Sequence, residues 1–176
     1  MLLRKINAVI SLLITALLLV HAGLISIWAL SRGSFPEPSG FMPWILTGFV
    51  AIHAFISIDM AISGHISGER HKCKKYPKLN VTTIFQRVSG FLMILFTGLH
   101  IAGATGVLQP PKVVHAILPV LFFTMVMAHI VVSTSKAFIT LGIGSARFIN
   151  LVNIVIRVIC GMVLIADIVG FYTFLV

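Results

Sequence analysis

Five long apolar stretches limit the folds open to this chain more than any other feature. They cover roughly residues 6–30, 42–64, 84–106, 112–134 and 149–174. A helix needs about 20 apolar residues to cross about 30 Å of hydrocarbon, and each stretch is near that length. Lipid offers no hydrogen-bond partners to an open backbone, so each stretch is predicted to be a helix. We expect an all-α integral membrane bundle of five transmembrane helices, with residues 1–176 forming a single domain.

The composition also argues against a soluble protein. Hydrophobic residues make up 59% of the chain, and only four residues are acidic. Soluble domains normally carry about a quarter charged residues. The formal charge of +9 could suggest nucleic acid binding, but the lysines and arginines gather at the ends of the apolar stretches. We therefore expect membrane lipid around the chain and no nucleic acid partner.

The basic residues predict the direction of insertion, because cytoplasmic loops carry the excess of Lys and Arg. One side of the membrane would hold most of the basic residues: Arg4, Lys5, Arg70, Lys72, Lys74, Lys75, Lys78, Arg87, Lys136 and Arg147. The opposite side would have only Arg32 and Lys112. The N-terminus and the loop of about residues 65–83 are expected in the cytoplasm, and the C-terminus outside. That loop is either a topology signal attracted to anionic lipid or a docking surface for a cytoplasmic partner.

Four histidines lie inside four different apolar stretches, where an ionisable side chain is costly and suggests a functional site. At about 1.5 Å per residue, His21 and His100 reach similar depths in the outer half of the membrane. His129 lies in the inner half, and His53, nearer the middle, groups with it. Neutral imidazole is a common axial ligand of haem iron. Two pairs at two depths therefore predict two bis-histidine haems.

The same four histidines are also compatible with roles that need no haem. A single intramembrane histidine often only hydrogen-bonds a neighbouring helix. Zinc is a weaker rival, because it requires ligands that converge at one depth in tetrahedral geometry. A haem-free anchor or small transporter with structural or proton-relaying histidines is therefore an alternative to a haem protein.

The stretch Gln86-Arg87-Val88-Ser89-Gly90, followed by an apolar run to His100, resembles a known helix signature. It is similar to the Gln-Arg-x-(Ser/Thr)-Gly…His third helix of the five-helix, dihaem cytochrome b subunits of succinate:quinone oxidoreductases. This family includes succinate dehydrogenases and quinol:fumarate reductases. His53-Ala54, His129 and His21 resemble its second-, fourth- and first-helix ligands. The resemblance extends to about Phe148, and the fifth stretch matches only in being apolar.

The resemblance implies two haem b groups in a multi-pass subunit of the cell inner (cytoplasmic) membrane. His21 and His100 would bind the distal haem near the outer face, and His53 and His129 the proximal haem. Flavoprotein and iron–sulfur subunits on the cytoplasmic face would carry out the succinate or fumarate chemistry. This chain would anchor them and exchange electrons with a quinone, which the dihaem members suggest is menaquinone. A dihaem cytochrome of another dehydrogenase or hydrogenase is the related alternative.

Polar residues near the expected haems have two interpretations each. A cation such as Arg87, or with less support Arg4, Lys5 or Lys136, could pair with haem propionates or serve only as a topology charge. Ser89 and Gly90 are small enough to let a flat macrocycle approach, or simply another helix.

Proton chemistry is where the chain departs from part of the family. Some dihaem fumarate reductases carry a glutamate two residues before the fourth-helix ligand, and here Met127 occupies that position. Proton exchange at one face is therefore expected instead. Glu37, in the outer loop, is either the proton acceptor for quinol oxidation or a solvated loop acid. Asp59 has no assigned role, and Asp167 is expected near the outer surface, protonated, or paired with a group that the sequence does not reveal.

Overall fold

The computed structural model describes residues 2–31, 34, 40–66, 77–108 and 111–175, and these residues contain five α-helices. The helices are α1 (Leu2–Leu30), α2 (Met42–Ile66), α3 (Pro77–Ala104), α4 (Lys112–Leu141) and α5 (Ala146–Leu175). All five are long and apolar enough to cross a membrane. The expected all-α bundle of five transmembrane helices is confirmed, whereas its direction of insertion stays a prediction.

Several helices extend beyond the apolar stretches that predicted them. α3 begins at Pro77 rather than near residue 84, and proline suits a first helical turn because the N–H there has no intrahelical partner. α4 continues to Leu141 rather than 134 and ends at Gly142, whose positive φ of 74° reverses the chain. At this turn the Gly142 N–H donates to the Ile139 carbonyl oxygen, and the Ile143 N–H donates to that of Phe138. A helix therefore continues past its apolar stretch until a residue stops it.

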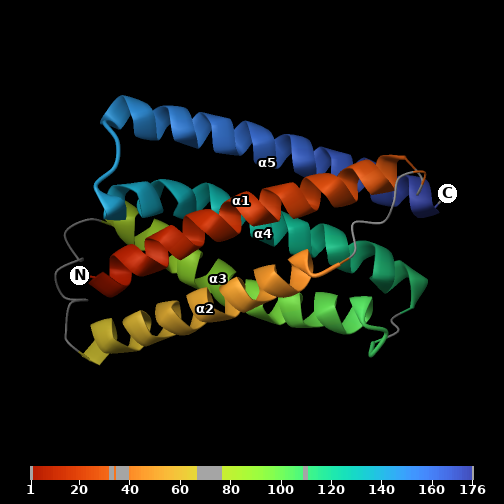
Figure 1. Cartoon of the computed structure of the whole chain (residues 1–176), viewed down its shortest axis with the longest axis horizontal. Coiled ribbons are helices and arrows are strands. Elements are labelled where there is room, and N and C mark those ends of the chain that lie inside the picture. Colours follow the sequence, from red (N-terminus) through yellow and green to blue (C-terminus); the bar gives the residue numbers. More distant parts are fainter. Residues whose placement is uncertain (1, 32–33, 35–39, 67–76, 109–110, 176) are drawn as a thin grey trace.

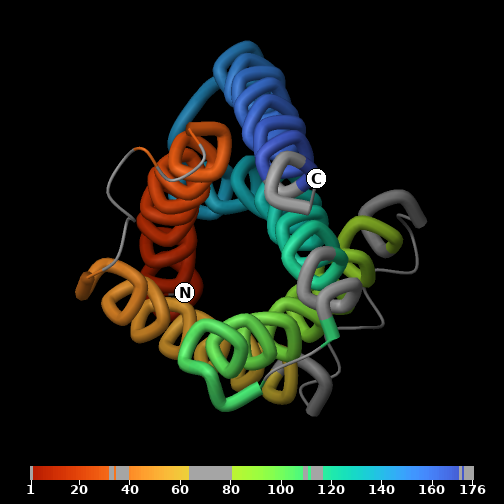
Figure 2. The backbone as a smooth tube through the Cα atoms, turned by 90° about the vertical axis from the view of Figure 1, so that its right-hand side faces the viewer, coloured from red at the N-terminus to blue at the C-terminus, as the bar shows by residue number. Residues whose placement is uncertain are grey.

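The helices run up and down, so that the two termini lie at opposite ends of the bundle (Figure 1). We call these the N end and the C end. Figure 2 shows α1, α2, α3 and α4 arranged around a common interior, with α5 outside this ring. Close contacts join α1 to α2 and α4, α4 to α3, and α5 to both α1 and α4. The four helices that carry the intramembrane histidines are thus the four that enclose the interior.

The buried core lies where α1, α4 and α5 meet. It consists of Ala22, Phe122, Phe123, Val126, Met127, Ile130 and Cys160. Large apolar side chains elsewhere face outward, such as Phe55, which is 75% exposed, and Phe91, which is 71% exposed. Extensive exposed apolar surface marks a face that meets another apolar phase. In a chain with five membrane-spanning helices, that phase is lipid.

A buried polar pair joins α1 to α5. The Asp167 side chain is fully buried, and the Ser26 hydroxyl donates to its Oδ1 at 2.5 Å. One turn further along α5, a Cβ added at Gly170 would lie 2.7 Å from the Ala29 Cβ, so the two helices are in close contact here. Ser26 is the partner of Asp167 that the sequence did not reveal. Asp59, by contrast, is exposed on α2.

Candidate functional site: two cavities lined by histidine pairs

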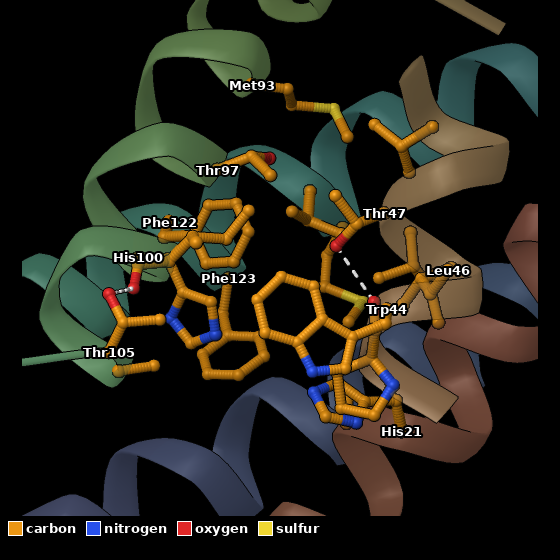
Figure 3. Close-up of a pocket in the computed structure, with 18 of the residues that line it drawn as sticks. His21, Trp44, Leu46, Thr47, Met93, Thr97, His100, Thr105, Phe122 and Phe123 are labelled. Atoms are coloured by element: carbon orange, nitrogen blue, oxygen red, sulfur yellow. Dashed lines mark hydrogen bonds between the residues drawn. The ribbon is translucent and has the colours of Figure 1, made fainter. Parts of the chain in front are cut away.

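The larger of the two cavities that these histidines line contains the first predicted pair. It has a volume of about 310 Å³, and its walls come from α1, α2, α3 and α4. His21 of α1 and His100 of α3 both line it, together with mostly apolar side chains (Figure 3). Ligand sites typically have volumes of about 300–1,000 Å³. This cavity is therefore large enough and apolar enough for an organic ligand.

An aromatic contact from another helix holds the His100 ring. Its imidazole stacks on Phe122 of α4, with ring centroids 5.1 Å apart and an interplanar angle of 23°. Phe122 is 8% exposed and in turn contacts Phe123, with centroids 5.8 Å apart. His21 lies close enough to His100 for the two rings to interact electrostatically. The packing of α4 thus sets the orientation of a histidine on α3.

The smaller cavity contains the second predicted pair, His53 of α2 and His129 of α4. Its volume is about 40 Å³, and these two rings also interact electrostatically. Leu18, Val50 and Met93 line both cavities, so the two are neighbours within one interior. The structure therefore brings together His21 with His100 and His53 with His129, the same pairs that depth along the helices predicts.

Ser89 of α3 fixes the His129 ring. Its hydroxyl oxygen lies 2.8 Å from His129 Nδ1 and 3.2 Å from the Gln86 carbonyl oxygen, to which the hydroxyl donates. With its hydrogen directed to Gln86, the Ser89 oxygen is left to accept from Nδ1–H. That tautomer leaves Nε2 with a free lone pair, as in metal-ligating histidines, whose other nitrogen is held by a hydrogen bond. Ser89 is 1% exposed, so water does not compete for this contact.

Gly90 also contacts the His129 ring. A Cβ added at Gly90 would lie 3.4 Å from His129 Cε1, so the imidazole packs directly against the α3 backbone. The sequence predicts that a macrocycle or another helix approaches closely at Ser89 and Gly90. In the structure, their neighbour is the His129 ring. The Ser-Gly pair on α3 therefore positions the histidine of α4.

Two cationic side chains, Lys136 and Arg87, lie between the His129 ring and the N end of the bundle. Lys136 Nζ donates to Gln86 Oε1 at 2.8 Å, and Lys136 interacts electrostatically with both Arg87 and His129. Neither Lys136 nor Arg87 has an acidic partner within the described part of the chain. Two neighbouring cations without a counter-charge are suited to bind carboxylates.

Glu37 and Met127 are the remaining residues for which the sequence predicts a role in proton transfer or its absence. Glu37 lies outside the described residues, so its expected role as a quinol proton acceptor stays a prediction. Met127 is 4% exposed and lines the larger cavity, where its apolar side chain adds no proton-carrying group.

The donor set suits haem better than a bare metal ion. Among the described residues, no group of three or more His, Cys, Asp or Glu side chains could hold a metal ion. A haem iron needs only two protein ligands, because the porphyrin nitrogens supply the others. The larger cavity has space for part of such a group. The smaller cavity is below the usual size of a ligand site, so a macrocycle would enter only if the side chains between His53 and His129 moved apart.

No protein-family model, curated protein or solved structure matches this chain. Its function is therefore argued from the motifs and from the geometry of the two cavities.

Proposed function

We propose that the chain is a dihaem cytochrome b, the membrane-anchor subunit of a succinate dehydrogenase or fumarate reductase complex. The observation that carries this proposal is the arrangement of four intramembrane histidines from four helices. Each of the two neighbouring cavities contains one pair. Histidines that only stabilised helix packing would not need to line cavities in pairs.

In this proposal, His21 and His100 hold one haem b, and His53 and His129 hold the other. Haem supplies one-electron transfer. The chain's own residues orient the ligands: Ser89 holds Nδ1 of His129, and Phe122 holds the plane of His100. The larger cavity is lined mostly by apolar side chains, and burial is one of the factors that set a haem potential.

The N end is the proposed cytoplasmic face, following the bias of Lys and Arg. Arg87 and Lys136 would pair there with the propionates of the haem between His53 and His129. Flavoprotein and iron–sulfur subunits would dock on this face and carry out the oxidation of succinate or the reduction of fumarate. The haem between His21 and His100 would then lie near the outer face of the inner membrane.

A membrane quinone, by resemblance menaquinone, is the proposed electron partner of this subunit. Glu37 remains the proposed proton acceptor if the subunit oxidises quinol. With Met127 in place of a glutamate, we propose no proton route along α4. Protons are taken up or released at one face.

Affinity purification of the tagged chain from mildly solubilised membranes of its native host tests the assignment to this complex. We expect a flavoprotein with covalently bound flavin and an iron–sulfur subunit to co-purify, and added succinate or quinol to reduce the haem. The untagged strain is the control for non-specific capture. Co-purification with a hydrogenase or another dehydrogenase instead would keep the cytochrome but reject this complex. A colourless protein would support a haem-free anchor or transporter.

A further inference from the structure

Asp167 of α5 is a carboxyl group buried at the contact between α5 and α1. Its exposed fraction is 0%, and its Oδ1 lies 2.5 Å from Ser26 Oγ of α1. Among the described residues, its other oxygen, Oδ2, has no hydrogen-bond partner. A charged carboxylate inside a membrane-spanning helix is costly unless it is paired. A single contact with a hydroxyl group leaves that charge without compensation.

No described cationic side chain compensates the charge of Asp167. Arg157 precedes it on α5 by about ten residues, which is about 15 Å along the helix axis, and its side chain is exposed. On α1, Lys5 lies about 20 residues before Ser26, or about 30 Å along the axis. Lys136 of α4 is near the N end of the bundle, whereas Asp167 lies in the C-end half of α5 (Figure 1). Compensation must therefore come from something smaller than a side chain.

The hydrogen bonds of Ser26 indicate what that is. Ser26 Oγ lies 2.8 Å from the Ala22 carbonyl oxygen and 2.5 Å from Asp167 Oδ1. A hydroxyl group has one hydrogen, and neither a carbonyl oxygen nor a carboxylate can supply another. With an ionised Asp167, the two contacts would have to share that hydrogen. A protonated Asp167 brings a second hydrogen, so that each contact has its own.

We propose that Asp167 and Ser26 form a proton-binding site between α1 and α5. Asp167 is a neutral carboxylic acid whose Oδ1–H donates to Ser26 Oγ, and the Ser26 hydroxyl then donates to the Ala22 carbonyl oxygen. The unpartnered Oδ2 becomes the carbonyl oxygen of a neutral group. Burying a neutral oxygen without a partner costs far less than burying a charged one.

The packing around the site favours retention of the proton. One turn after Asp167, a Cβ added at Gly170 would lie 2.7 Å from the Ala29 Cβ, and Ala29 is 2% exposed. The two helices therefore meet closely beside the carboxyl group. Asp167 lines neither histidine cavity, and α5 lies outside the ring of helices that encloses them (Figure 2). The site thus goes beyond the proposed function and does not depend on bound haem.

Infrared spectroscopy of the purified protein tests the proposal, because protonated and ionised carboxyl groups absorb at different frequencies. The chain has two aspartates, Asp59 and Asp167, and Asp59 is exposed on α2. In Asp59→Asn, aspartate labelled with ¹³C at the side-chain carboxyl therefore reports on Asp167 alone. We expect the labelled band at the frequency of a protonated carboxyl group at neutral pH. This design leaves Asp167 itself unchanged.

Ser26→Ala in the same labelled background tests the hydrogen bond. It removes the acceptor of the carboxyl hydrogen, so the labelled band should move to higher frequency. Thr15→Val is the matched control, because Thr15 is a buried residue of α1 whose hydroxyl donates to the Ser11 carbonyl oxygen of its own helix. This variant should leave the band in place.

A labelled band of a protonated carboxyl group that moves in Ser26→Ala but not in Thr15→Val would support the inference. A labelled band only at the carboxylate frequency would overturn it. A protonated band that Ser26→Ala leaves unmoved would overturn the pairing with Ser26. Because none of these bands requires haem, a colourless protein would overturn the proposed function without deciding the state of Asp167.

Discussion

Replacing His129 with alanine is expected to remove one haem and to leave the other in place. His129 lines only the smaller cavity, and the pair in the larger cavity stays intact. The haem content per polypeptide should fall by about half, because a haem with one protein ligand lost is no longer held on both sides. His100→Ala should give the same loss but remove the other haem. Pigment analysis and redox titration of the two purified variants measure both results.

The remaining two histidines provide the internal control for this pairing. His53→Ala should remove the same haem as His129→Ala, and His21→Ala the same haem as His100→Ala. Variants of one pair should therefore give matching absorbance and resonance spectra. If His53→Ala and His100→Ala removed the same haem, the proposed pairing would be wrong.

The second large effect is expected at Gly90, where the His129 ring packs against bare backbone. An alanine Cβ would lie 3.4 Å from His129 Cε1, at the edge of normal contact, so Gly90→Ala should keep both haems. The additional methyl groups of Gly90→Val would press further on that side of the ring. Overpacking a buried site typically costs about 1–3 kcal/mol, and here the ring is the group that would be displaced. We expect Gly90→Val to lose the haem that His129→Ala loses, as measured by haem content and spectrum.

Gly98→Val is the matched control for this prediction. Gly98 lies on the same helix, but a Cβ added there would meet no atom within 4 Å. This variant should keep both haems and the wild-type spectrum. Equal haem loss in the Gly98 and Gly90 valine variants would show a general effect on α3 and contradict a specific role of Gly90.

The sequence predicts the five helices well because lipid leaves the backbone few alternatives. It does not predict their ends, which depend on local stop signals rather than on apolar length. α3 begins at Pro77, well before its apolar run, and α4 continues until the positive φ of Gly142. Nor does the apolar pattern indicate that α5 lies outside the ring, because all five helices have similar composition.

The histidine pairs follow from depth, which can be counted along each helix. Contacts such as Ser89 with His129 and Ser26 with Asp167 could not be predicted, because they depend on how each helix is rotated about its axis. One chemical feature of the sequence does indicate which residues could form these contacts. A buried imidazole or carboxyl group needs a polar partner at the same depth on another helix, and Ser26 and Ser89 are among the few polar residues within their apolar runs.

The haem content of the purified wild-type chain, measured together with its absorbance spectrum, tests the central claim most directly. We predict two haem b groups per polypeptide and the low-spin spectrum of iron bound by two imidazoles. A single haem per polypeptide would contradict the assignment of one haem to each histidine pair. A colourless protein would contradict the account as a whole.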